Sequence, residues 1–216
     1  MLTPVFAVPN TDLKFTEIVV DTKGTPMPNV IAVDPSLTGT GICVVHKGKF
    51  FVALLGDKGK RGLERLTYLA GQFARLVAAL PGYDLIIEGY AMGARDSHSH
   101  SLGEVGGAYK MAAFSSRRRV ITPSPNTIKK FATGKGNAPK EIVMKELFKR
   151  WGIDVDSNNL ADAVAIALFF GYGWHIQQGL AVSLPALNTE AITTAIKDKT
   201  LEGQGMTVLA RPRLAS

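Results

Sequence analysis

Three acidic side chains lie within or at the end of strongly apolar segments. Asp34 ends the run VIAVD, Glu88 ends the run DLIIE, and Asp162 interrupts the segment NNLADAVAIALFF. Burial of an unpaired carboxylate is costly. A divalent cation such as Mg²⁺ offsets that cost, because it takes oxygen ligands from carboxylates, water and phosphate groups. Two such ions about 4 Å apart can stabilise the attacking and the leaving oxygen in phosphodiester hydrolysis, so the three acids together indicate metal-dependent phosphodiester chemistry.

Each acid taken alone also has an ordinary structural interpretation. An aspartate at the end of a strand is often a turn former, and Asp162 could be a salt-bridge partner. Only the combination of the three acids favours a metal site.

A strongly basic stretch supports the same chemistry. Residues 110–150 contain eleven Lys or Arg and two Glu, a local balance of +9 in a chain of net charge +7. A basic face of this kind favours a polyanion, with nucleic acid first, although lysines that only solvate a surface are the alternative. Candidate contacts to a DNA backbone are Lys130, Lys135, Arg117 and Arg118. Alternatively, the two arginines are solvent-exposed residues that only lead into the next strand. Gly134 allows close approach of a backbone or simply a turn.

The elements that must position these residues follow from apolar periodicity. Three apolar runs followed by alternating helical and strand patterns predict a mixed sheet flanked by helices. We expect strands at 30–34, on both sides of a turn near 47–49, at 84–88 and at 119–123, and helices at 62–80, 97–114, 126–132, 139–151 and 158–170. Residues 1–29 are expected to be an irregular extension, and residues 176–216 an appendage with one helix near 189–199.

The composition agrees with a globular protein. The chain has 216 residues, of which 46% are hydrophobic and 20% charged, enough for one sizeable domain. No window holds the roughly 18 uninterrupted apolar residues that span a bilayer, and the N-terminus does not look like a signal peptide. Cys43 is the one cysteine and fits a reducing compartment, so we expect a soluble cytoplasmic protein.

In four blocks the chain resembles the RuvC family of Holliday junction resolvases, endonucleases with an RNase H-like fold. The blocks are AVDPSLTGTGICVV, LIIEGYAM, KKFATGKGNAPKE and NNLADAVAIA, in the order of the family. The resemblance implies a five-stranded mixed sheet, a nuclease domain over residues 30–175, and paired nicking of four-way DNA junctions that leaves 5′ phosphates. It also implies Mg²⁺, or Mn²⁺, as two ions per active site, and a homodimer.

The resemblance assigns roles to individual residues. Asp34, Glu88 and Asp162 would hold the metal ions, and Lys129 and Lys140 would lie near the scissile phosphate. Tyr90 matches a position near which the family carries a base-stacking aromatic residue, although it could equally be a packing residue.

One position departs from the family. Where relatives have an acidic or metal-binding residue three positions before the last Asp, this chain has Asn159, which we interpret as a neutral metal ligand. Asp154 or Asp156 could compensate for the missing charge. His98 and His100 are interpreted as polar surface or DNA contacts rather than metal ligands.

The sequence is also compatible with other functions. An Asp with a Gly-rich turn also occurs in actin-like ATPases and sugar kinases, but the chain has no second phosphate loop and no Walker lysine motif. A nuclease of the same fold that cuts other branched DNA or RNA:DNA hybrids is a second possibility. A non-catalytic junction-binding protein, suggested by Asn159, is a third.

Overall fold

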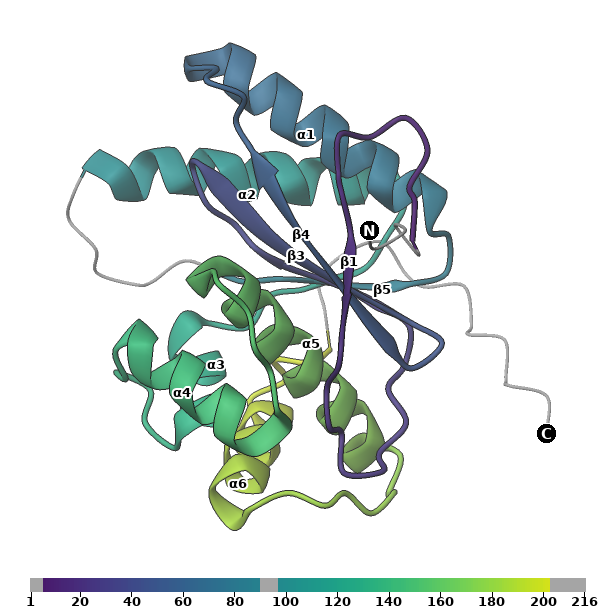
Figure 1. The fold of residues 1–216 in the computed structure, drawn as a ribbon, viewed down its shortest axis with the longest axis vertical. Helices are drawn as coiled ribbons and strands as arrows, with labels where there is room; N and C mark the ends of the chain where they lie inside the picture. Colours follow the sequence, from purple (N-terminus) through teal and green to yellow (C-terminus); the bar gives the residue numbers. More distant parts are fainter. Residues whose placement is uncertain (1–5, 90–96, 203–216) are drawn as a thin grey trace.

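The structure is a computed structural model, and it describes residues 6–89 and 97–202, with only the backbone of residues 97–100. A mixed sheet lies between two layers of helices, with α1 and α2 above it and α3 to α6 below it in the view of Figure 1. The strands are β1 (Thr16–Ile18), β2 (Val30–Asp34), β3 (Gly39–His46), β4 (Lys49–Gly56), β5 (Asp84–Ile87) and β6 (Val120–Ile121). The helices are α1 (Gly62–Ala79), α2 (Ser97–Ser115), α3 (Pro125–Thr133), α4 (Lys140–Trp151), α5 (Asn158–Gln177) and α6 (Ala186–Lys197).

The sheet has six strands in the order β1-β4-β3-β2-β5-β6. β2, β3 and β4 form an antiparallel meander, in which the two-residue turn Lys47–Gly48 connects β3 to β4 with both residues at positive φ. Positive φ at both positions is the geometry of a tight hairpin. β5 and β6 then add parallel to β2, so β2 is the strand at which the sheet changes from antiparallel to parallel pairing.

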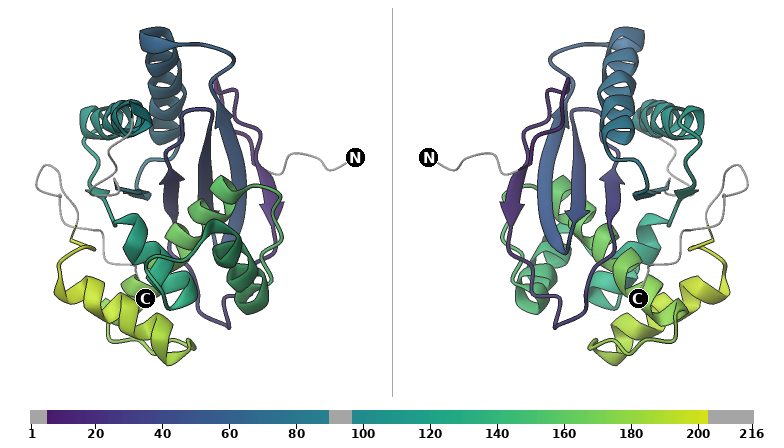
Figure 2. Two further views of the ribbon diagram at one scale, coloured as in Figure 1. Left: turned by 90° about the vertical axis from the view of Figure 1, so that its left-hand side faces the viewer. Right: turned by 90° about the vertical axis from the view of Figure 1, so that its right-hand side faces the viewer.

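Alternate residues of the central strands serve two separate cores. Ile31 and Val33 of β2 pack with α1 and α2, whereas Val30 and Ala32 pack with α3 to α6. α5 is apolar on nearly all sides, because it is covered by the sheet on one side and by the other helices of its layer on the other. The views in Figure 2 show α6 at the outer end of this layer, next to α3.

The predicted mixed sheet flanked by helices is confirmed, with one strand more than expected. The sixth strand is β1, three residues of the segment 1–29 that pair antiparallel with β4. β1 has no hydrophobic alternation and is largely exposed, so its sequence carries no strand pattern. α6 begins three residues earlier than expected, directly after Pro185, whose extended backbone fits the position before a first helical turn.

Some of the predicted contact residues lie outside the described part of the structure. Tyr90 lies outside the described residues, and so do the side chains of His98 and His100. Within the described chain, none of the helices combines the length and apolar character needed to cross a bilayer.

α5 approaches the sheet more closely than a side chain would allow. A Cβ added at Gly41 of β3 would lie 1.9 Å from the carbonyl oxygen of Asn159, the second residue of α5. The glycine is therefore required by the contact between a strand and a helix backbone, neither of which can move like a flexible side chain.

We expect Gly41→Ala to lower the free energy of unfolding by about 1 to 3 kcal/mol or more, because α5 must shift away from β3. Urea denaturation measures this change. The matched control is Gly71→Ala in α1, where an added Cβ meets nothing within 4 Å, so alanine should be neutral or stabilise by up to about 1 kcal/mol. Equal stability of the two variants would contradict the close approach of α5.

Candidate active site

Strand pairing brings Asp34 and Glu88 together. β2 and β5 are parallel neighbours in which Val33 is level with Ile87, so the next residue of each strand emerges at the same edge of the sheet. The backbone N–H of Glu88 donates to the carbonyl of Val33 over 2.9 Å, which extends the pairing to the acid itself. The Asp34 residue is only 6% exposed and Glu88 is half-buried.

The pKa values of both carboxyl groups are raised. Burial, followed by repulsion from Asp162, raises the pKa of Asp34 to about 7, although Lys140 and a hydrogen bond with Glu88 act in the opposite direction. Burial also raises the pKa of Glu88 well above its ordinary value, followed by repulsion from Asp34 and Asp162 and by the same hydrogen bond. Near neutral pH the pair therefore tends to retain a proton between its two carboxyl groups.

Asp162 comes from α5 and faces two lysines. Burial raises its pKa, while Lys140 lowers it by charge and by a hydrogen bond, and Lys129 lowers it by charge. The Nζ atom of Lys140 lies 3.5 Å from Oδ2 of Asp162, and the lysine side chain remains 49% exposed. The structure thus gathers three acids and two lysines from five elements that lie far apart in the sequence.

Asn159 has a role in packing that its sequence position did not reveal. Its Nδ2 donates to the carbonyl of Gly39 over 2.6 Å, beside the close contact at Gly41. The side chain therefore fastens the first turn of α5 to the strand that follows the Asp34 turn, and only its amide oxygen remains as a candidate metal ligand. Asp154 and Asp156 are both exposed, and their proposed compensating role stays a prediction.

The turn after Asp34 is held by residues that the sequence analysis did not single out. The fully buried hydroxyl of Thr40 donates to the carbonyl of Ser36 and accepts from its N–H. It also lies 2.8 Å from the hydroxyl of Tyr109 on α2. Ser and Thr residues in a turn weakly indicate local hydrogen bonds. The contact with Tyr109, however, joins residues that are 69 positions apart, so it could not be predicted from the local sequence.

The carboxylate oxygens of the site are the type of ligand, and carry the charge, that a divalent cation prefers. Two buried carboxyl groups that share a hydrogen bond, with a third carboxylate acting on both, carry the negative charge that such an ion neutralises. Among residues 6–89 and 97–202, however, no group of three or more His, Cys, Asp or Glu side chains is already arranged around one metal position. Asp34 and Glu88 therefore form the core of the candidate site, and Asp162 lies at its border beside Lys140.

The other predicted DNA contacts lie in different environments. Lys135 and Arg117 are exposed, Arg117 with a positive φ of 53°. Lys130 forms an ion pair of 3.3 Å with Glu190 of α6. Arg118 donates to the carbonyl of Leu80 over 3.0 Å, so its guanidinium holds the end of α1 in place. For all four residues a contact with DNA stays a prediction.

Comparison with known proteins places this chain in a family. A sequence model of the family described as "Crossover junction endodeoxyribonuclease RuvC" matches residues 30–170. The chain belongs to the RuvC family. The crossover junction endodeoxyribonuclease RuvC of Chloroherpeton thalassium (strain ATCC 35110 / GB-78) is 30% identical to it over 146 residues, which make up 64% of this chain and 78% of that relative.

Solved RuvC structures share the fold. RuvC of T. thermophilus in complex with Holliday junction substrate superposes with a TM-score of 0.53 and 22% identity, over 72% of this chain and 98% of that one. A second structure of Thermus thermophilus RuvC gives a TM-score of 0.51 and 25% identity, over 72% and 99%. The predicted RNase H-like fold is thereby confirmed, and the two predicted acidic strand ends and the acid of α5 all lie within the matched RuvC residues.

The raised pKa of Asp34 predicts that stability depends on pH. Since the folded-state pKa of about 7 exceeds the ordinary value of 3.8, the folded chain binds more protons than the unfolded chain between these values. It therefore loses stability as the pH rises through that window. Without divalent cations, we expect the free energy of unfolding at pH 8 to be lower than at pH 5 by about 1 kcal/mol or more, since one pKa unit corresponds to about 1.4 kcal/mol.

Denaturant unfolding of the wild type and of Asp34→Asn over this pH range measures the effect. The variant should show a flatter pH dependence, because it lacks the titrating group, and Mg²⁺ at pH 8 should stabilise the wild type more than the variant. The same pH dependence in both chains would contradict the shared proton.

Proposed function

We propose that this RuvC family member resolves Holliday junctions by metal-dependent paired nicking, during recombination, repair or phage DNA processing. The observation that carries the proposal is the pair Asp34 and Glu88, buried at one edge of the sheet with raised pKa values, beside the Asp162–Lys140 ion pair. A buried acidic group next to exposed lysines suits a phosphate backbone only when cations neutralise the acids. The name of the curated relative and the junction bound to one Thermus structure support this substrate.

Asp34, Glu88 and Asp162 would hold Mg²⁺, or Mn²⁺, with the amide oxygen of Asn159 as a neutral ligand. When bound, such ions stabilise charge on the attacking and leaving oxygens and lower the pKa of a bound water. The chain itself contributes the orientation of the acids through the β2 and β5 pairing. Because the three acids come from separate elements, their spacing is fixed by the fold rather than by one flexible loop.

Lys140 and Lys129 are proposed to act on the phosphate. Both lower the pKa of Asp162, so both lie within electrostatic reach of the acids. A lysine at this position can neutralise charge that develops on the phosphate in the transition state. In the absence of DNA the Lys140 ammonium pairs with Asp162, which keeps the lysine near the site without burying it.

Further contacts with DNA and a second copy of the chain complete the proposed function. Lys130, Lys135, Arg117 and Arg118 are proposed backbone contacts, and Tyr90 a base-stacking contact. A homodimer with two active sites suits the two-fold symmetry of a junction. We also propose that residues 30–175 are the nuclease domain, with residues 1–29 and 176–216 as extensions, and that the protein acts in the cytoplasm of a bacterial cell or a phage-infected host.

The function is tested by incubating the wild type and Asp34→Asn with Mg²⁺ and four substrates of matched sequence. We expect the wild type to nick a four-way junction faster than a flap, a linear duplex or an RNA:DNA hybrid. Asp34→Asn should bind the junction and leave it intact, because a neutral amide contributes no charge toward the cation. Exclusive cleavage of the hybrid would overturn the substrate assignment, and junction binding without any nicking by the wild type would make the protein a junction binder.

The role of Lys140 is tested by alanine substitution. Lys140→Ala should lower the rate of junction cleavage at saturating enzyme by about 10²-fold, the order of the loss when one group that stabilises the transition state is removed. Its affinity for the junction should remain close to that of the wild type. The matched control is Lys149→Ala, an exposed lysine of the same helix that lines a surface groove with Ile142 and Arg150. Loss of binding without loss of rate in Lys140→Ala would reduce this lysine to a DNA anchor.

A further inference from the structure

Helix α6 lies beyond residues 30–170, which match the RuvC family, yet it is integrated into the α3 to α6 layer. Ala191, Ile192 and Ala195 are buried in the same core as α3, α4 and α5. α6 also covers the end of α3, since a Cβ added at Gly134 would lie 3.2 Å from Cδ1 of Leu187. The segment predicted as an appendage therefore packs against the helices that carry the two candidate lysines.

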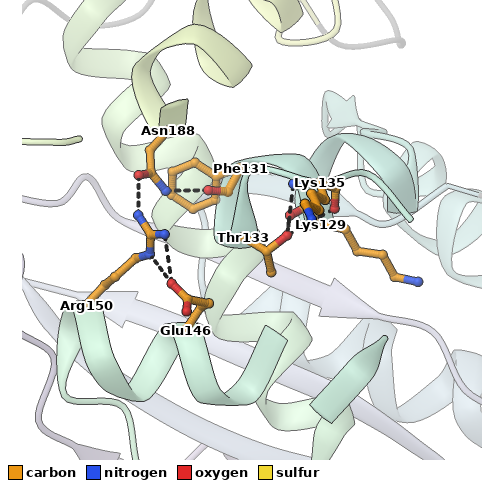
Figure 3. Close-up of polar contacts among 7 residues, drawn as sticks. All are labelled: Lys129, Phe131, Thr133, Lys135, Glu146, Arg150 and Asn188. Carbon is orange, nitrogen blue, oxygen red and sulfur yellow. Dashed lines mark hydrogen bonds and ion pairs between the residues drawn. The ribbon is translucent and has the colours of Figure 1, made fainter. Parts of the chain in front are cut away.

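A fully buried amide makes the central contact of α6. The Nδ2 of Asn188 donates to the carbonyl of Phe131 in α3, and its Oδ1 accepts from Nη1 of Arg150 in α4 over 2.8 Å (Figure 3). Arg150 in turn donates from Nε to the Glu146 carboxylate over 2.8 Å. One side chain thus joins three helices, and both ends of its amide group are used.

The carbonyl of Phe131 belongs to the last turn of α3, where backbone carbonyls have no partner within the helix. The Gly134 N–H satisfies the carbonyl of Lys130, and Asn188 satisfies the carbonyl of Phe131. Thr133 completes this end of the helix, because its hydroxyl contacts the carbonyls of Lys129 and Lys135 and accepts from the Lys135 N–H. The last turn of α3, which directly follows Lys129, is therefore held from α6 as well as from its own loop.

We propose that Asn188 is a positioning residue of the cutting site, which holds α3 and α4 in the register that keeps Lys129 and Lys140 beside Asp162. The inference rests on the proposed function of these lysines. A buried amide is suited to this task because it is satisfied only when both neighbouring helices are in place, and an unsatisfied buried polar group is costly. An apolar residue at position 188 would fill space without specifying which carbonyl and which guanidinium it meets.

The first test follows local opening by hydrogen exchange and needs no activity. Asn188→Ala should accelerate exchange of the amides at the end of α3, including Gly134, by about tenfold or more, while the central amides of α5 keep their protection. The control is Thr194→Ala, an exposed residue of α6 whose hydroxyl donates to the carbonyl of Glu190 within the same helix. Should Asn188→Ala fold poorly, Asn188→Asp serves instead, because it keeps an acceptor for Arg150 and cannot, when ionised, donate to Phe131.

The second test asks whether Asn188 acts through Lys129. Junction cleavage at saturating enzyme is measured for Asn188→Ala, Lys129→Ala and the double variant. If Asn188 positions the lysine, the double variant should cut at least about threefold faster than the product of the two single losses allows, because residues that act as a unit are not additive. Additive losses, or unchanged exchange at the end of α3, would overturn the proposal. A wild type that does not nick refutes the proposed function, and the exchange measurement then decides the structural role alone.

Discussion

Mutual repulsion between buried carboxyl groups is the constraint on which the rest of this structure depends. Asp34 and Glu88 lie at adjacent strand ends with little access to water, and Asp162 adds a third negative charge. Such an arrangement costs free energy unless a proton, a lysine or a metal ion compensates for it. In the described structure, Asp34 and Glu88 share a hydrogen bond, which requires a proton on one of the two carboxyl groups. Lys140 contacts Asp162. A fold that maintains this cost in its core has a use for the site, and the proposed metal-dependent cutting of DNA would account for it.

The architecture holds the repelling groups together through the backbone. Parallel pairing of β2 with β5 sets Asp34 level with Glu88, and the missing side chain at Gly41 lets α5 bring Asp162 to the same edge. From the same helix layer as α5, α3 and α4 supply the lysines, and α6 ties these two helices to each other. Each group therefore owes its place to an element whose core packing is independent of the chemistry, which keeps the site rigid while the lysine heads remain accessible.

The places of Asp34 and Glu88 at strand ends could be predicted from the sequence, whereas most polar contacts between elements could not. Asp34 and Glu88 could be located because each ends an apolar strand, and the sheet was predictable because its strands are apolar runs bounded by turns. Strand β1 was missed, since three largely exposed residues carry no periodicity. The bond from Asn159 to Gly39 spans 120 residues, and its amide was interpreted only as a metal ligand. Asn188 was missed because a single Asn in an amphipathic helix does not reveal that it is buried. Local patterns report burial of an element, whereas these polar contacts depend on which elements meet.

The most direct test of the central claim is the position of a bound ion. Crystals of the protein soaked in Mn²⁺ near pH 8 would be measured for anomalous scattering. The account predicts a peak within about 2.0 to 2.3 Å of carboxylate oxygens from both Asp34 and Glu88, distances typical of divalent ions bound by carboxylates. Anomalous density only at other surface acids, with Asp34 and Glu88 still hydrogen-bonded to each other, would contradict it.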